Sequence, residues 1–149
     1  MRKIKILSKK EIKAIKKKIF LQYGAECELD YVFLRNQKDK LYIANKEVFE
    51  IPEDRIRIDS LGIYFGTMER TELRLSIEGS LIVGKHATKG MIEISYDDMK
   101  KWLKGEEIKT ESNELGFILI KHNDDFLGCG RIKDGMLLNY YPKARRIHT

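Results

Sequence analysis

The residues of this sequence whose types and spacing could do chemistry are basic and aromatic side chains, most of them near the C-terminus. Lysine and arginine neutralise phosphates and planar side chains stack on unpaired bases, so this combination is typical of an RNA-binding surface. We predict that the RNA-contacting residues are Lys85, His86, Lys89, Arg131, Lys133, Tyr140, Tyr141, Lys143, Arg145 and Arg146. Adjacent strand residues point opposite ways, so one tyrosine would face the RNA. The alternatives are core positions for one or both tyrosines and a solvated tail for the last two arginines.

No combination of side chains in the sequence indicates catalysis. The histidines at 86, 122 and 148 lack the H-x-x-x-H and H-E-x-x-H spacings of metal sites. The paired carboxylates at 97–98 and 124–125 are typical of helix caps and turns, and no glycine-rich phosphate loop is present. Cys27 and Cys129 are far apart, which favours buried thiols over a disulfide or a zinc site. We therefore expect no enzyme activity, no cofactor and no metal.

The composition indicates a folded chain with two basic ends. Of 149 residues, 42% are hydrophobic and 35% are charged, and the net charge is +6. Residues 2–22 hold nine Lys or Arg against Glu11 alone, whereas the middle of the chain is acidic. No apolar run is long enough for a membrane span and no signal-type segment follows the basic start, so we expect a cytoplasmic protein. The abundance of Lys, Glu and Ile is a thermophile-like composition.

The N-terminal half predicts one helix and several strands. Residues 1–7 alternate as a short strand, Ser8 and Glu11 have capping-box spacing, and Gly24 is typical of a helix end. Residues 27–35 and 40–44 form a predicted hairpin, 45–50 could be a short helix or strand, and 55–58 alternate. Two apolar strands follow, 61–66 and 73–79, joined by a charged loop. Lys16, Lys17 and Lys18 are interpreted as a solvated helix face, with phosphate contact as the alternative.

The C-terminal half predicts a small β unit with one helix. After an apolar run at 80–83 and a polar loop at 84–90, residues 91–94 form a strand, and Ser95 caps a helix that runs to Lys104. Two apolar runs flank the polar residues 122–125 as in a hairpin, and Asp134-Gly135 predicts a second tight turn. Gly128 and Gly130, two residues apart, indicate a bend or the close approach of another backbone.

These last motifs resemble a known domain. Residues 127–130, Leu-Gly-Cys-Gly, and the stretch from Gly135 to Arg146 resemble the end of the PUA-like domain of Sun-family RNA cytosine-C5 methyltransferases. The resemblance also includes residues 102–108 and implies an RNA-binding β-barrel without the catalytic domain of those enzymes. It places Lys143 and Arg146 at family positions, while Ala144 departs from the family's usual glycine.

A second resemblance concerns the whole chain. The stretch Leu61-Gly62-Ile63-Tyr64-Phe65-Gly66 and the following Leu-Arg-Leu strand resemble the N-terminal half of Nip-type ribosome-biogenesis proteins, which join an α/β domain to a C-terminal PUA domain. We therefore predict an α+β fold, with a small N-terminal α/β domain (1–83) packed on a C-terminal PUA-like β-barrel (84–149).

The function predicted from these resemblances is non-enzymatic binding of rRNA or tRNA, with ribosome biogenesis or pre-rRNA processing as the specific role. The alternative is a stand-alone accessory subunit that recruits an RNA-modifying enzyme such as an RNA cytosine-C5 methyltransferase. Ribosome-assembly or RNA-modification proteins would be its partners. A protein–protein module with incidental basic charge is the third possibility.

Overall fold

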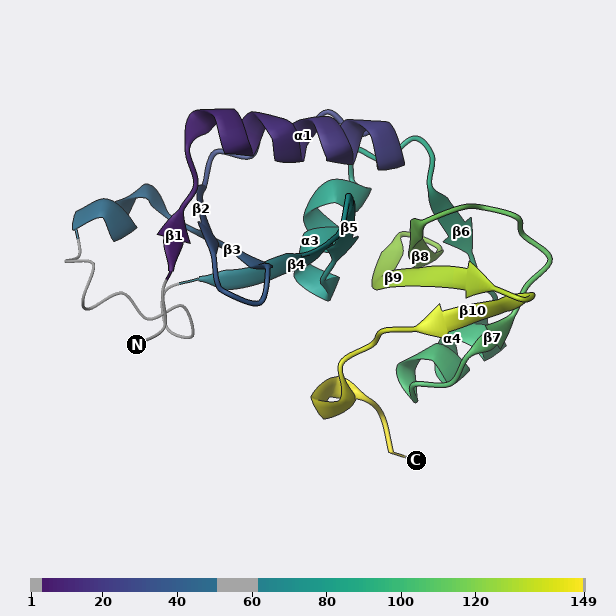
Figure 1. Cartoon of the computed structure of the whole chain (residues 1–149). Coiled ribbons are helices and arrows are strands. Elements are labelled where there is room, and N and C mark those ends of the chain that lie inside the picture. The colour runs from purple at the N-terminus through teal and green to yellow at the C-terminus, as the bar shows by residue number, and fades with distance from the viewer. Residues whose placement is uncertain (1–3, 51–61, 149) are drawn as a thin grey trace.

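Two five-stranded sheets form the framework of the computed structural model, which describes residues 4–50 and 62–148 (Figure 1). The N-terminal sheet is antiparallel throughout and holds, in spatial order, β1 (Lys5–Ile6), β2 (Val32–Arg35), β3 (Lys40–Ala44), β4 (Ile63–Glu69) and β5 (Glu72–Leu75). The C-terminal sheet holds, again in spatial order, β6 (Met91–Glu93), β8 (Phe117–His122), β9 (Asp125–Lys133), β10 (Met136–Asn139) and β7 (Ile108–Lys109). The α+β class is confirmed, with a half-barrel in the C-terminal region. The predicted strand at 55–58 and the first three residues lie outside the described residues.

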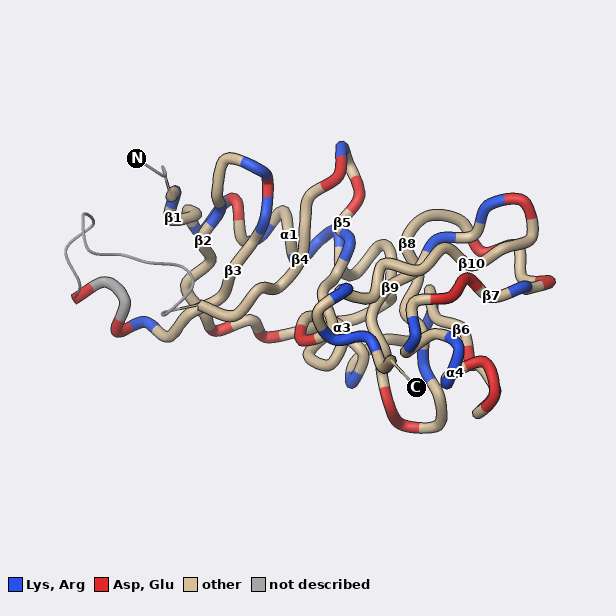
Figure 2. Tube along the Cα trace, turned by 90° about the horizontal axis from the view of Figure 1, so that it is seen from below, with Lys and Arg blue, Asp and Glu red and all other residues tan. Residues whose placement is uncertain are grey.

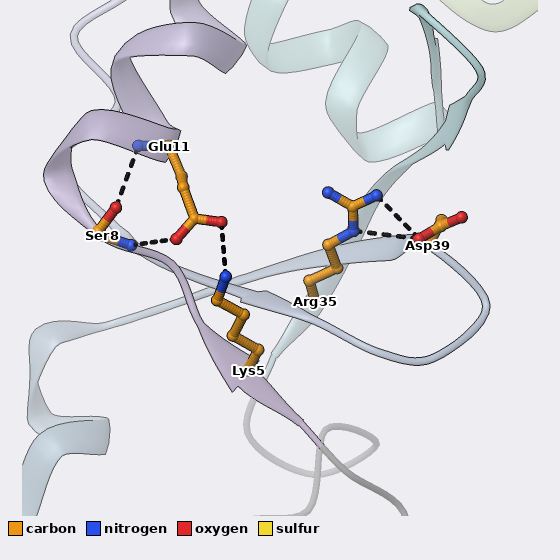
Figure 3. A network of polar contacts seen from close by, with 5 residues as sticks. All are labelled: Lys5, Ser8, Glu11, Arg35 and Asp39. Atoms are coloured by element: carbon orange, nitrogen blue, oxygen red, sulfur yellow. Dashed lines mark hydrogen bonds and ion pairs between the residues drawn. The ribbon is translucent and has the colours of Figure 1, made fainter.

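Helix α1 (Lys9–Tyr23) begins where the capping-box spacing predicts (Figure 3). The Ser8 hydroxyl accepts a 3.2 Å hydrogen bond from the Glu11 backbone N–H, and the Glu11 carboxylate accepts one of 3.1 Å from the Ser8 N–H. Lys5 donates to the same carboxylate at 3.0 Å, and this hydrogen bond, with that from Ser8, holds the pKa of Glu11 below its usual range. Gly24 ends the helix in the left-handed conformation. In the same view Arg35 and Asp39 form an ion pair of 2.8 Å across the β2–β3 turn.

The segment before the second sheet is helical and not extended. The predicted strand at 73–79 is wrong from Ile77 onward, because helix α3 (Ile77–Gly84) begins there. Ser76 caps this helix, and its hydroxyl accepts a 2.9 Å hydrogen bond from the Gly79 N–H. The helix is apolar on nearly every side, so its sequence carries no amphipathic period from which a helix could be recognised. It packs close to β4, where a Cβ at Gly79 would lie 2.1 Å from the Phe65 carbonyl oxygen.

The other predicted elements of the described chain are found close to their expected places. Helix α4 (Tyr96–Leu103) is capped by Ser95. Of the two alternatives for residues 45–50, a short helix or a strand, the structure has a helix, the 3-10 helix η1 (Lys46–Glu50). A second 3-10 turn, η3 (Lys143–Arg145), follows the last strand. None of the helices in the described ranges is long and apolar enough to cross a membrane.

One apolar core is shared by both sheets. It joins side chains of the N-terminal sheet such as Phe33 and Phe65 to Phe117, Leu119 and Cys129 of the C-terminal sheet. A smaller cluster lies around Trp102, on the α4 side of the second sheet. The strands of the two sheets lie on either side of residues 83 and 84, but the shared core gives no dividing line, so the domain boundary stays a prediction.

Strand β9 contains the bend that its glycines predict. Leu119 is paired with Cys129 but Lys121 with Phe126, so β9 carries one extra residue there, a β-bulge at Leu127 and Gly128. The φ of Gly128 is +100°, which L side chains rarely adopt. A Cβ at Gly130 would lie 3.1 Å from the backbone carbonyl oxygen of Leu138 in β10, and 3.0 Å from the Trp102 ring. The bend and the close approach are both present, one at each glycine.

Candidate nucleic-acid interface

The predicted C-terminal residues are positioned by Asn139, the last residue of β10. Its side-chain amide donates to the carbonyls of Trp102 at 2.9 Å and Glu106 at 2.8 Å, and its Oδ1 accepts from the Tyr141 N–H at 2.7 Å. The first two bonds tie the exit of the strand to the end of α4, and the third fixes the turn of the chain at Tyr141. Asn139 was not among the predicted site residues, because an asparagine that binds backbone groups has no signature of its own in sequence.

The two tyrosines follow the last residue of β10 and pack against different clusters. Tyr140 packs on the shared core, with its ring edge-on to Phe117 at 5.7 Å and the Arg74 guanidinium 4.7 Å from its centroid. Tyr141 packs against the Trp102 cluster. Both are half-buried. One face of the Tyr140 ring already holds a cation, so Tyr141 is the better candidate for stacking on a base.

A cavity of about 400 Å³ lies where the two sheets meet. Its walls combine the start of α3, the β9 bulge and the C-terminal segment, and include Arg74, Glu78, Gly128, Tyr141 and Arg145. The Arg145 guanidinium forms a 2.6 Å ion pair with the Glu78 carboxylate. In Figure 2 the basic C-terminal turn lies over α3. The cavity therefore combines aromatic and cationic side chains.

The last three predicted cations differ in how accessible they are. Lys143 is exposed and has no ion pair within the described chain, and Arg145 is exposed but paired with Glu78. Arg146 is half-buried, donates from Nε to the Tyr141 carbonyl at 3.1 Å, and covers Gly105, where a Cβ would lie 2.4 Å from that Nε. The alternative of a solvated tail does not hold for Arg146, because the chain folds back onto the end of α4, where the Ile147 N–H donates to the Leu103 carbonyl at 2.9 Å.

Two predicted residues on β9 lie apart from this cavity. Arg131 is exposed, forms an ion pair of 3.1 Å with Glu72 of the other sheet, and lies 5.2 Å from the centroid of Phe117. Lys133 is exposed at the end of β9, opposite Met136. Figure 2 shows both basic and acidic residues in the part of the chain that forms this sheet.

The predicted loop residues Lys85, His86 and Lys89 lie at the other end of α3. Glu78, which binds Arg145, is in the first turn of this helix, whereas Lys85 follows its last residue, about 10 Å farther along at 1.5 Å per residue. The loop is held against the end of α1, where Thr88 N–H donates to the Tyr23 carbonyl at 2.8 Å. Figure 1 shows the loop near α1 and the C-terminal turn on the opposite side of the molecule. The structure does not bring the two predicted groups together.

The described residues offer little to a metal or a nucleophilic mechanism. Within 4–50 and 62–148 no group of three or more His, Cys, Asp or Glu could hold a metal ion. His122 binds the Ile94 carbonyl through Nδ1 at 2.8 Å. Burial raises the pKa of Cys129, whose thiol lies 3.6 Å from the Tyr23 hydroxyl, and burial likewise raises the pKa of Tyr23. Both groups are therefore protonated near neutral pH, and neither is an activated nucleophile.

Comparison with known proteins gives one domain match and two relatives. Residues 89–147 match the family model described as the methyltransferase RsmF PUA domain. The chain is 24% identical to the ribosomal RNA small subunit methyltransferase F of Aeromonas hydrophila subsp. hydrophila over 96 residues, which cover 64% of this chain and 20% of that protein. It is 22% identical to the protein of the same name from Aeromonas salmonicida over 111 residues, 70% of this chain and 23% of that protein.

The matches cover different parts of this chain and only a small part of the relatives. The chain spans about a fifth of the length of the two relatives. Both alignments are longer than the 89–147 match, so the similarity also reaches into the N-terminal half. The Nip-type resemblance of the whole chain stays a prediction. The predicted resemblance of the C-terminal part to the PUA-like domain of RNA methyltransferases is confirmed for residues 89–147, which contain β6 to β10, α4 and the C-terminal turn.

Proposed function

We propose that this protein binds structured RNA through its PUA domain, and that the cavity beside Tyr141, Lys143 and Arg145 is the contact surface. The observation that carries the proposal is the match of residues 89–147 to the RsmF PUA domain, since PUA domains bind RNA. The C-terminal turn supports it with two exposed cations beside a half-buried tyrosine. Such a surface can hold phosphates and stack one unpaired base.

The RNA we propose is ribosomal, with tRNA as the alternative, and the role is ribosome biogenesis or pre-rRNA processing without catalysis by this chain. The relatives are named for small-subunit rRNA methylation, which favours rRNA and also supports our second candidate. In that candidate the protein recruits or positions an RNA-modifying enzyme, such as a cytosine-C5 methyltransferase, on its substrate. Co-purification of a methyltransferase with the protein would favour this second role over the first.

The test is fluorescence anisotropy with a small-subunit rRNA fragment, a tRNA and a duplex DNA across a salt series. We expect tighter binding to RNA than to DNA. The double variant Lys143→Gln and Arg145→Gln should weaken RNA binding, and the log–log salt slope should fall by about 0.7–0.9 for each phosphate that is no longer neutralised. A control with equal charge change, Lys38→Gln in the β2–β3 turn and Lys40→Gln at the start of β3, should leave both quantities unchanged.

Three results would contradict the proposal. Equal and weak binding to RNA and DNA would mean that the basic residues are only solvated charge. Unchanged affinity in the double variant, with a normal circular dichroism spectrum, would place the contact surface elsewhere. Calorimetric binding of S-adenosylmethionine by this chain would contradict the non-catalytic role.

A further inference from the structure

The face of α1 that points away from the core carries a stripe of lysines. Five of them are exposed and have no ion pair within the described ranges: Lys9, Lys10, Lys13, Lys16 and Lys17. The helix has one acidic residue, Glu11, and its carboxylate is taken by Lys5 and by the Ser8 backbone. Lysines three and four residues apart on a helix repel one another, so a polyanion bound along this face would be stabilised by them and would relieve the repulsion.

A groove of about 820 Å³ follows this stripe. One wall is α1, through Lys10, Lys13, Lys16, Lys17 and Phe20, and the other is the segment 25–28 that follows the helix. Phe20 is 48% exposed although it is a large aromatic residue. Lysines beside an exposed aromatic ring are the pairing that single-stranded nucleic acids use, with phosphates on the cations and a base on the ring.

The second wall of the groove differs in charge from α1, and this difference would orient a bound nucleic-acid strand. It carries Glu26 and Glu28, both exposed, which repel phosphates but can accept hydrogen bonds from the amino groups of cytosine and adenine. The α1 wall attracts phosphates. A strand lying in the groove would therefore place its backbone against α1 and its base edges toward 25–28, an arrangement open only to unpaired bases.

We propose that this groove binds a single-stranded RNA segment, with its phosphates on Lys13, Lys16 and Lys17 and one base stacked on Phe20. The proposal rests on the proposed function and adds a second site on the side of the molecule opposite the C-terminal turn. The loop with Lys85, His86 and Lys89 adjoins Tyr23 at the Phe20 end of the groove. The predicted loop cations would then extend this second site and not the PUA cavity.

The test uses the full chain with a short single-stranded oligoribonucleotide rich in A and C, and the same sequence as a blunt duplex. The triple variant Lys13→Gln, Lys16→Gln and Lys17→Gln should lower single-strand affinity at least about tenfold and reduce the salt slope by about 2, at roughly 0.7 per phosphate. Phe20→Ala should weaken single-strand binding about fivefold or more and leave duplex binding unchanged. The matched control is Lys100→Gln, Lys101→Gln and Lys104→Gln on and after α4, with the same charge change.

A readout independent of affinity comes from Cys27, which lines the same groove. Bound single strand should slow the reaction of its thiol with a maleimide, and the triple variant should lose this protection. Equal losses on duplex and single strand in Phe20→Ala, or no protection of Cys27, would overturn the site. Competition by poly-glutamate as effective as that by RNA would also overturn it, since the groove would then be a surface for acidic proteins.

The failures of the two proposals are distinguishable. If the Lys143 and Arg145 variant loses RNA binding while the α1 variant keeps it, this inference alone is wrong. If the unmodified protein binds no RNA, both proposals are wrong.

Discussion

The indole N–H of Trp102 donates a 2.9 Å hydrogen bond to the carbonyl of Leu127, inside the β9 bulge. Trp102 is fully buried, and Leu127 is one of the two residues that form the β9 bulge. The bond therefore joins α4 to the bulge, and the bulge lines the cavity proposed as the RNA site.

Trp102→Phe should destabilise the protein, because it leaves the Leu127 carbonyl without its donor and empties part of the core. The unsatisfied carbonyl alone costs about 1–3 kcal/mol. Urea unfolding should show a lower midpoint. The control Tyr96→Phe, on the exposed side of the same helix, should stay within about 0.5 kcal/mol of the parent. Equal stability of the two variants would mean that the bond is not formed in solution.

Substitution of Arg146 should lower the free energy of unfolding, whereas substitution of Lys143 should not. Arg146→Ala removes the cover of Gly105 and the bond to the Tyr141 carbonyl, so it should destabilise by about 1 kcal/mol. Lys143→Ala should leave the free energy of unfolding within about 0.5 kcal/mol of the parent. Thermal unfolding of both variants checks this, and a loss in Lys143→Ala with none in Arg146→Ala would reverse our assignment.

The capping box should make stability depend on pH in the acid range. The pKa of Glu11 is lowered from 4.5, mainly by the hydrogen bond from Lys5. A carboxyl with a lowered folded-state pKa stabilises fully above its ordinary pKa, and that contribution is lost as pH falls through the depressed value. Glu11→Gln should therefore be less stable than the parent near neutral pH, with a difference that shrinks as the pH falls below the ordinary pKa of 4.5 and through the lowered one. Glu107→Gln, at an exposed position, is the control, and a pH-independent difference for Glu11→Gln would contradict this account.

The two thiols should differ in reactivity. Cys129 is 3% exposed and Cys27 is half-buried, and burial raises the pKa of both. We expect that a thiol reagent labels Cys27 slowly in the native protein and labels Cys129 only in denaturant. Cys27→Ser should abolish native labelling, and fast reaction of Cys129 in the folded chain would contradict its burial.

Much of the fold follows from local sequence. The Ser8 and Glu11 capping box, the Ser95 cap and the Asp134-Gly135 turn each rest on interactions within four residues, so their spacing alone predicts them. The PUA assignment was also available from sequence, because its motif keeps fixed internal spacing. Helix α3 was not, since a helix that is apolar on nearly every side lacks the period that distinguishes it from a strand.

The candidate sites depend on contacts between residues far apart in the chain. By itself the sequence determined which residues are basic or aromatic, and that they lie near the two ends and in one loop. Only the tertiary structure decided that Arg146 covers Gly105, that Arg145 meets Glu78, and that the loop at 85–89 joins α1 and not the C-terminal turn. The physical reason is that α3 separates the two groups, and its position depends on the packing of both sheets around it.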